Sequence, residues 1–203
     1  MSKLFDLDNP VWRFMGKVFD MMVLTVLWAL TSLPIVTIGA STTALYYVSL
    51  KQASDQEGYV VKDFFRAFQE NFKQATLAWL ILLALGIFFA GDLWWYSHFK
   101  EGVGVMVFFM FVILTVFYVM TLSYVFPILA RCQVTIKKLF LMAFVMSVKN
   151  FGWTLLMVTT TVCLLAVGIF VCAPFLILAV GLMGYLHGKI LNIVFEQYHL
   201  MLA

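Results

Sequence analysis

The sequence predicts an all-α polytopic membrane protein. We expect four full transmembrane helices in two hairpins, preceded by an N-terminal span that is broken and returns by a short helix. Of the 203 residues, 64% are hydrophobic and only 11% are charged, whereas about 25% of residues are charged in soluble domains. Several uncharged stretches also reach the ~20 residues that cross a ~30 Å hydrocarbon layer. Residues 1–203 are therefore expected to form one integral membrane domain.

Residues 1–17 are expected to be a cytoplasmic N-terminus, followed by a broken helical hairpin over residues 18–50. The 30 residues between Asp20 and Lys51 are uncharged. As one helix they would measure roughly 45 Å. This length is too great for one straight crossing and too short for two complete ones, so the sequence predicts one span and a short return.

Pro34 and Gly39 interrupt this stretch, because proline cannot continue the hydrogen-bond ladder of a helix. Ser41 and Thr42 are expected to cap the return helix. Irregular backbone at membrane depth is tolerated only where protein or a watery cavity covers it, so we expect the break to be buried among other helices. The candidate site residues of the broken helix are Thr31, Ser32, Pro34, Thr37, Gly39, Ser41, Thr42 and Thr43.

The rest of the chain divides into residues 51–126 and 127–203, each predicted as an amphipathic helix plus a transmembrane hairpin, the second with a short tail. The two parts are weakly similar, since in each an Ala-Phe pair precedes a lysine by five residues. Proline cannot continue a helix but suits the first turn of the next one. We therefore expect Pro127 to end the span from Val103 to Phe126, and Pro174 to mark the turn between spans at 154–171 and 174–194.

The amphipathic helices are expected over Lys62 to Lys73 and Lys137 to Lys149. In the first, Phe64, Phe68 and Phe72 share one face. Such a helix either lies in the membrane interface or docks a cytoplasmic partner. The basic candidates for docking are Lys62, Arg66, Lys73, Lys137, Lys138 and Lys149.

Basic residues indicate the orientation, because cytoplasmic loops carry an excess of Lys and Arg. If residues 18–50 enter and return, the 13 basic residues divide twelve to one. If those residues cross once, the division is nine to four. The first arrangement places both termini in the cytoplasm, and five spans with the N-terminus outside is the alternative.

Polar residues inside the last span are His187, Lys189 and Asn192. His187 is expected to be a hydrogen-bonded packing residue, with a gating or proton-relay role as the alternative. No phosphate-binding loop, metal-ligand spacing or nucleophile motif occurs in the sequence. We expect no catalytic residue, no metal, no cofactor and no nucleic-acid partner, and we expect the three cysteines to be packing residues.

Three segments carry a family resemblance. They are LWALTSLPIVTIGASTTALYYVSLK (Leu27 to Lys51), EGYVVKDFFRAFQENFKQAT (Glu57 to Thr76) and SVKNFGWTLL (Ser147 to Leu156). Together they resemble the YesL-like family, small bacterial integral membrane proteins of unknown function. The resemblance implies a multi-pass protein of the bacterial plasma membrane, often encoded beside carbohydrate ABC transporters and sugar-sensing two-component systems.

Three functions are consistent with these features. The first is a non-catalytic accessory component of a carbohydrate ABC uptake or sensing system, with a transporter permease or a sensor kinase as partner. The second is a free-standing small-solute channel or facilitator whose path is lined by the broken helix. The third is a membrane scaffold. The sequence leaves the ligand and the oligomeric state open.

Overall fold

The structure is a computed structural model that describes residues 10–54, 56, 58–99, 102–170 and 176–198. Within these residues the chain forms helices and no strand, so the all-helical prediction is confirmed there. The turn expected at Pro174, the residue Cys172 and the end of the tail lie outside the described residues. In chain order the helices are α1 (Pro10–Thr31), η2 (Ile35–Thr37), α2 (Ile38–Ala53), α3 (Val60–Tyr96), α4 (Val103–Arg131), α5 (Ile136–Lys149), α6 (Phe151–Phe170) and α7 (Leu176–Gln197).

Four helices are long and apolar enough to cross a membrane: Val60–Tyr96, Val103–Arg131, Phe151–Ile169 and Leu178–Gln197. Their outer faces expose large apolar side chains, such as Phe109 and Met106, which is 76% exposed. Lipid rather than water is the solvent that such surfaces require. The chain is therefore a multi-pass membrane protein.

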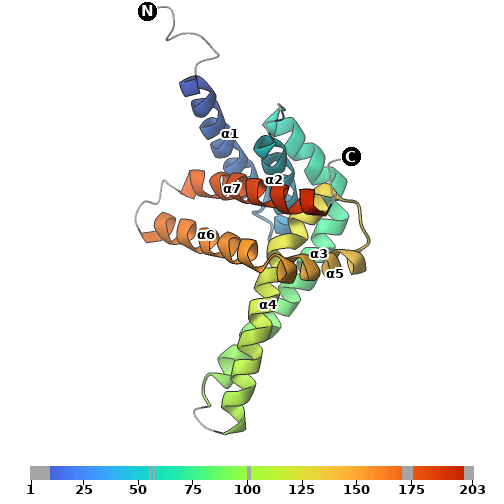
Figure 1. Cartoon of the computed structure of the whole chain (residues 1–203), viewed down its shortest axis with the longest axis vertical. Helices are drawn as coiled ribbons and strands as arrows, with labels where there is room; N and C mark the ends of the chain where they lie inside the picture. Colours follow the sequence, from blue (N-terminus) through green and yellow to red (C-terminus); the bar gives the residue numbers. More distant parts are fainter. Residues whose placement is uncertain (1–9, 55, 57, 100–101, 171–175, 199–203) are drawn as a thin grey trace, which may run out of the picture.

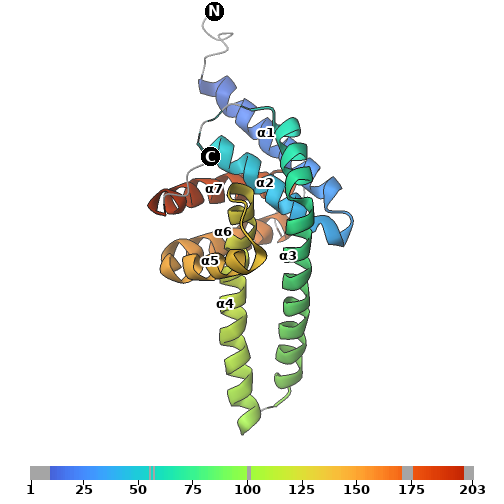
Figure 2. The same ribbon diagram turned by 90° about the vertical axis from the view of Figure 1, so that its right-hand side faces the viewer.

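Helices α3 and α4 form a long antiparallel hairpin whose far end extends away from the other helices (Figure 2). Helices α6 and α7 lie side by side and run across this hairpin, and both views show this crossing (Figures 1 and 2). Trp94 and Trp95, both exposed, lie near the far end of the α3–α4 hairpin. That position agrees with the interfacial belt that these aromatic rings favour.

Helix α2 is the centre of the packed core. Its neighbours are chiefly α3 and α7, and small residues bring the backbones together, as is typical of helices in membranes. A Cβ added at Gly184 would lie 2.5 Å from the Ser49 Oγ, and one at Gly188 would lie 2.8 Å from the Ser49 carbonyl oxygen. At Gly188 the close atoms belong to the Ser49 backbone, so a substitution there would push α7 away from α2, whereas at Gly184 the Ser49 and Leu45 side chains would have to move.

Helix α3 differs from the prediction, because the amphipathic segment from Lys62 to Lys73 and the following span are one uninterrupted helix of 37 residues. The change from charged to apolar sequence needs no break in the hydrogen-bond ladder. Phe64 is buried in the core, while Phe72 at the same face is exposed. The second segment does end before its span, since α5 stops at Lys149 and α6 begins at Phe151.

Pro127 does not end α4, contrary to the prediction, since the helix continues to Arg131. A proline removes a single backbone bond, and the ladder closes again where the Cys132 N–H donates to the Ile128 carbonyl at 2.8 Å. Tyr124 and Ile128, on either side of the proline, are fully buried. Packing of this last turn against the core offsets the cost of the proline.

Candidate functional site

The chain breaks between α1 and α2 at the predicted place, but the caps differ from the prediction. Helix α2 begins at Ile38 with Thr37 as its N-cap. Ser41 and Thr42 therefore lie inside the helix. The Ser41 hydroxyl donates to the Thr37 carbonyl at 3.0 Å, and the Thr42 hydroxyl accepts a bond from the Trp28 indole N–H at 3.2 Å.

The turn itself is held by side chains that bond its carbonyl groups. The Thr37 hydroxyl lies 2.6 Å from the Thr31 carbonyl and 2.7 Å from the Pro34 carbonyl. The Trp79 indole N–H of α3 donates to the Ile35 carbonyl at 2.8 Å. Trp79 thus fastens the turn to α3.

The break is not buried as a whole, which corrects the prediction. Leu33 is 77% exposed and Pro34 is exposed, whereas Gly39 and Ser41 are buried against α3. In this exposed turn the Thr37 hydroxyl and the Trp79 indole bond the carbonyl groups of Thr31, Pro34 and Ile35.

The buried half of the break is filled by protein. A Cβ added at Gly39 would lie 2.5 Å from the Ala75 carbonyl oxygen and 2.5 Å from the Trp79 Cβ. The Thr43 hydroxyl donates to the Gly39 carbonyl, and the Thr31 hydroxyl donates to the Leu27 carbonyl. Of the predicted broken-helix residues, only Ser32 keeps a buried hydroxyl without a partner among the described residues.

His187 joins three helices. It is 3% exposed. Its Nδ1 lies 3.0 Å from the Tyr46 hydroxyl of α2, and its Nε2 lies 3.1 Å from both the Thr160 hydroxyl and the Met157 carbonyl of α6. A carbonyl only accepts, so the proton of a neutral ring is on Nε2, and Nδ1 accepts from Tyr46. Both nitrogens are satisfied in the neutral state, which favours the packing interpretation over a proton relay.

The other polar residues of α7 are placed differently. Lys189 is exposed, with its Nζ 5.0 Å from the centre of the Tyr185 ring. The Asn192 amide donates to the Ser54 hydroxyl at 2.9 Å and to the Leu50 carbonyl at 3.2 Å. Asn192 thus ties α7 to the end of α2.

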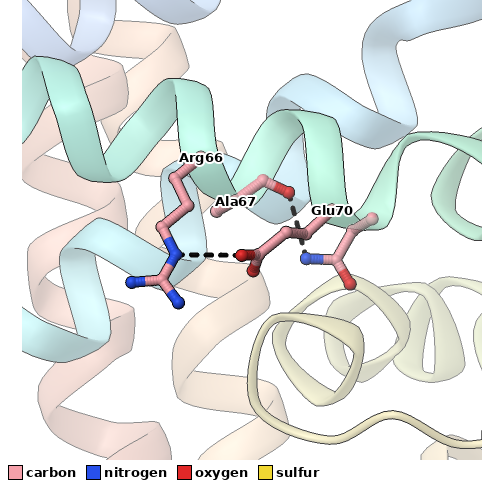
Figure 3. Close-up of polar contacts among 4 residues, drawn as sticks. Arg66, Ala67 and Glu70 are labelled. Carbon is pink, nitrogen blue, oxygen red and sulfur yellow. Dashed lines mark hydrogen bonds and ion pairs between the residues drawn. The ribbon is translucent and has the colours of Figure 1, made fainter.

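The six basic candidates are all exposed, and the structure brings two of them together. Lys73 of α3 and Lys137 of α5 line one open groove of about 790 Å³. Arg66 instead pairs with Glu70 along α3, where the Nε–Oε1 distance is 2.9 Å (Figure 3). Lys62, Lys138 and Lys149 do not line this groove.

Several contacts had no signal in the sequence. Tyr46 contacts His187, which lies 141 positions later in the sequence. The Gln74 amide donates to the Val134 carbonyl, and this bond fixes the segment before α5.

Burial raises the pKa of the Cys132 thiol. Cys132 is therefore a protonated thiol at neutral pH, and the described residues contain no group of three or more potential metal ligands from His, Cys, Asp and Glu.

Comparison with known proteins gives one family match. Residues 21–93 match the family described as "Protein of unknown function, DUF624". No curated protein and no solved structure matches the chain. The matched segment contains the second half of α1, the turn, all of α2 and α3 as far as Leu93. The similarity to this uncharacterised family therefore covers the broken helix and the side of α3 that carries Lys73, but not α5.

Proposed function

We propose that the chain is a non-catalytic accessory component of a bacterial carbohydrate ABC uptake or sensing system. It would lie in the plasma membrane with both termini in the cytoplasm and bind a transporter permease or a sensor kinase. The YesL-like resemblance suggests this class of system, and the DUF624 match over residues 21–93 is compatible with that resemblance.

The contrast between a closed interior and an exposed charged end of α3 supports this proposal. A channel needs polar groups that are free to face a solute. Here Gly39 is packed against the α3 backbone, and His187 has both ring nitrogens bonded within the chain. Lys62 and Arg66, by comparison, project from the first turns of α3 and are open to a partner.

The Arg66–Glu70 pair offers a docking test that separates surface charge from helix stability. Both side chains are well exposed, at 66% and 50%. Arg66→Glu places two carboxylates one turn apart and slightly destabilises the helix. The exchange Arg66→Glu with Glu70→Arg restores an ion pair but keeps the altered charge pattern.

The test expresses the full chain with a C-terminal tag in its native host and extracts it in mild detergent. The tagged protein is purified by affinity chromatography, and the proteins that copurify with it are identified by mass spectrometry. We expect a permease or a sensor kinase in near-stoichiometric amounts. Both the single and the exchanged variant should lose this partner, while Arg66→Lys should keep it.

Two outcomes would contradict the proposal. The first is recovery of the protein alone, combined with solute flux in liposomes that contain only this chain. The second is unchanged recovery of the partner from both charge variants, which would exclude this end of α3 as the docking surface.

A further inference from the structure

The groove that contains Lys73 and Lys137 lies where α3 changes from charged to apolar. Its walls are α3 on one side and the segment that leads into α5 on the other. From Ala75 to Gly91 the helix has no charged residue. The groove is open to its surroundings and has a volume of about 790 Å³.

The lining of this groove has one sign of charge. It consists of Lys73, Gln74, Leu77, Gln133, Val134, Thr135, Ile136 and Lys137, without an acidic residue. The nearest carboxylate along α3 is Glu70, which is already paired with Arg66. Within the described residues, neither Lys73 nor Lys137 has an ion-pair partner. Two lysines that form no ion pair within the described part of the chain therefore line a common space.

The distribution of polarity matches an amphiphile. Lysines, amides and a hydroxyl supply donors for an anion, while Leu77, Val134 and Ile136 supply an apolar wall that continues into the uncharged part of α3. The bond from Gln74 to the Val134 carbonyl fixes the two walls relative to each other.

We propose that this groove binds an anionic phospholipid, with the phosphate between Lys73 and Lys137 and the acyl chains along α3 beyond Leu77. A lysine beside an anionic membrane surface contributes about 1 kcal/mol of attraction, or roughly fivefold in affinity. The site differs from a diffuse basic surface because it needs two particular lysines on two different helices. Lys138 neighbours Lys137 on α5 but lies outside the groove, which makes it the matched control.

The test uses the purified full chain in detergent and native mass spectrometry. The protein is titrated with dioleoylphosphatidylglycerol, with dioleoylphosphatidylcholine and inorganic phosphate as comparison ligands. We expect a saturable first phosphatidylglycerol adduct. Lys73→Gln and Lys137→Gln should each weaken it about fivefold, whereas Lys138→Gln and Lys73→Arg should leave it nearly unchanged. The substituted lysines are exposed, so all variants should unfold at the same temperature as the unmodified protein. This measurement checks that each variant is folded.

Three outcomes would overturn the proposal. If Lys138→Gln weakens the adduct as much as Lys73→Gln does, the lipid responds to general charge and not to the groove. If inorganic phosphate alone displaces the lipid with the same dependence on lysines, the ligand is a free anion. If amine-reactive labelling shows the two lysines protected in native membranes but not in phosphatidylglycerol vesicles, the groove holds a protein.

Discussion

Gly181 of α7 lies directly against the backbone of α1, and its replacement by alanine gives a sharp test of the packing. An added Cβ would lie 2.2 Å from the Met21 carbonyl oxygen, 2.8 Å from the Met21 carbonyl carbon and 2.9 Å from the Met21 Cα. These are backbone atoms, so no side-chain rotation can relieve the clash. Gly181→Ala is therefore expected to force α1 and α7 apart.

The size of the effect follows from the distances. Ordinary contact begins at 3.4 Å, so the helices must separate by more than 1 Å at this point. The same shift weakens the bond from the Gly181 N–H to the Thr25 hydroxyl, now 2.9 Å long. Overpacking costs about 1–3 kcal/mol, the lost hydrogen bond about 0.5–1.5 kcal/mol, and the better helix propensity of alanine returns about 1 kcal/mol. A net loss of about 0.5–3.5 kcal/mol in unfolding free energy is expected.

Thermal unfolding of the detergent-solubilised protein measures this loss. Gly91→Ala is the matched control, because a Cβ there has no atom within 4 Å, and it should be neutral or stabilising by up to about 1 kcal/mol. Met21→Ala should not rescue Gly181→Ala, since the clash involves only the Met21 backbone. Equal stability of the two glycine variants, or rescue by Met21→Ala, would refute the reasoning.

Three further predictions concern the contacts around the core. Tyr46→Phe removes the partner of His187 Nδ1 and should lower the unfolding free energy by about 1–3 kcal/mol; unchanged thermal stability would contradict a hydrogen bond between Tyr46 and His187. Trp79→Phe leaves the Ile35 carbonyl without its indole donor, so hydrogen exchange should accelerate at the amides of residues 32–38 and stay constant near the end of α2. The raised pKa of Cys132 predicts that its maleimide labelling, in a chain without the other cysteines, still increases above the pH at which labelling of a free cysteine levels off. A plateau at the same pH would show an ordinary thiol.

The sequence predicted the class of protein and the place of the break because both depend on local chemistry. Long uncharged stretches need lipid, and Pro34 lacks the N–H that would continue α1. The two errors in helix ends have the opposite origin. Pro127 is retained within α4 because Tyr124 and Ile128 pack on both sides of it. The continuity of α3 through Lys73 was missed because a change in polarity gives no information about whether the backbone ladder stops.

The candidate site depends on pairings that no local pattern records. His187 was identified as a packing residue, but its partner Tyr46 is in a helix near the other end of the chain. Lys73 and Lys137 were both identified as basic candidates, and the sequence contains no sign that they line one groove. This pairing arises because the segment before α5 lies against α3, where the Gln74 amide donates to the Val134 carbonyl, and contacts between distant segments decide that placement.

The uninterrupted α3 couples two environments mechanically. Its 37 residues measure roughly 55 Å at ~1.5 Å per residue, whereas the hydrocarbon layer is ~30 Å thick. If α3 crosses without tilt, about 25 Å of it therefore lies beyond the hydrocarbon, and no break in the helix marks the boundary. The first turns of α3 pack on α2, where the Lys51 ammonium pairs with the Asp63 carboxylate at 2.6 Å. A change in the tilt of the apolar part of α3 would therefore move α2 with it.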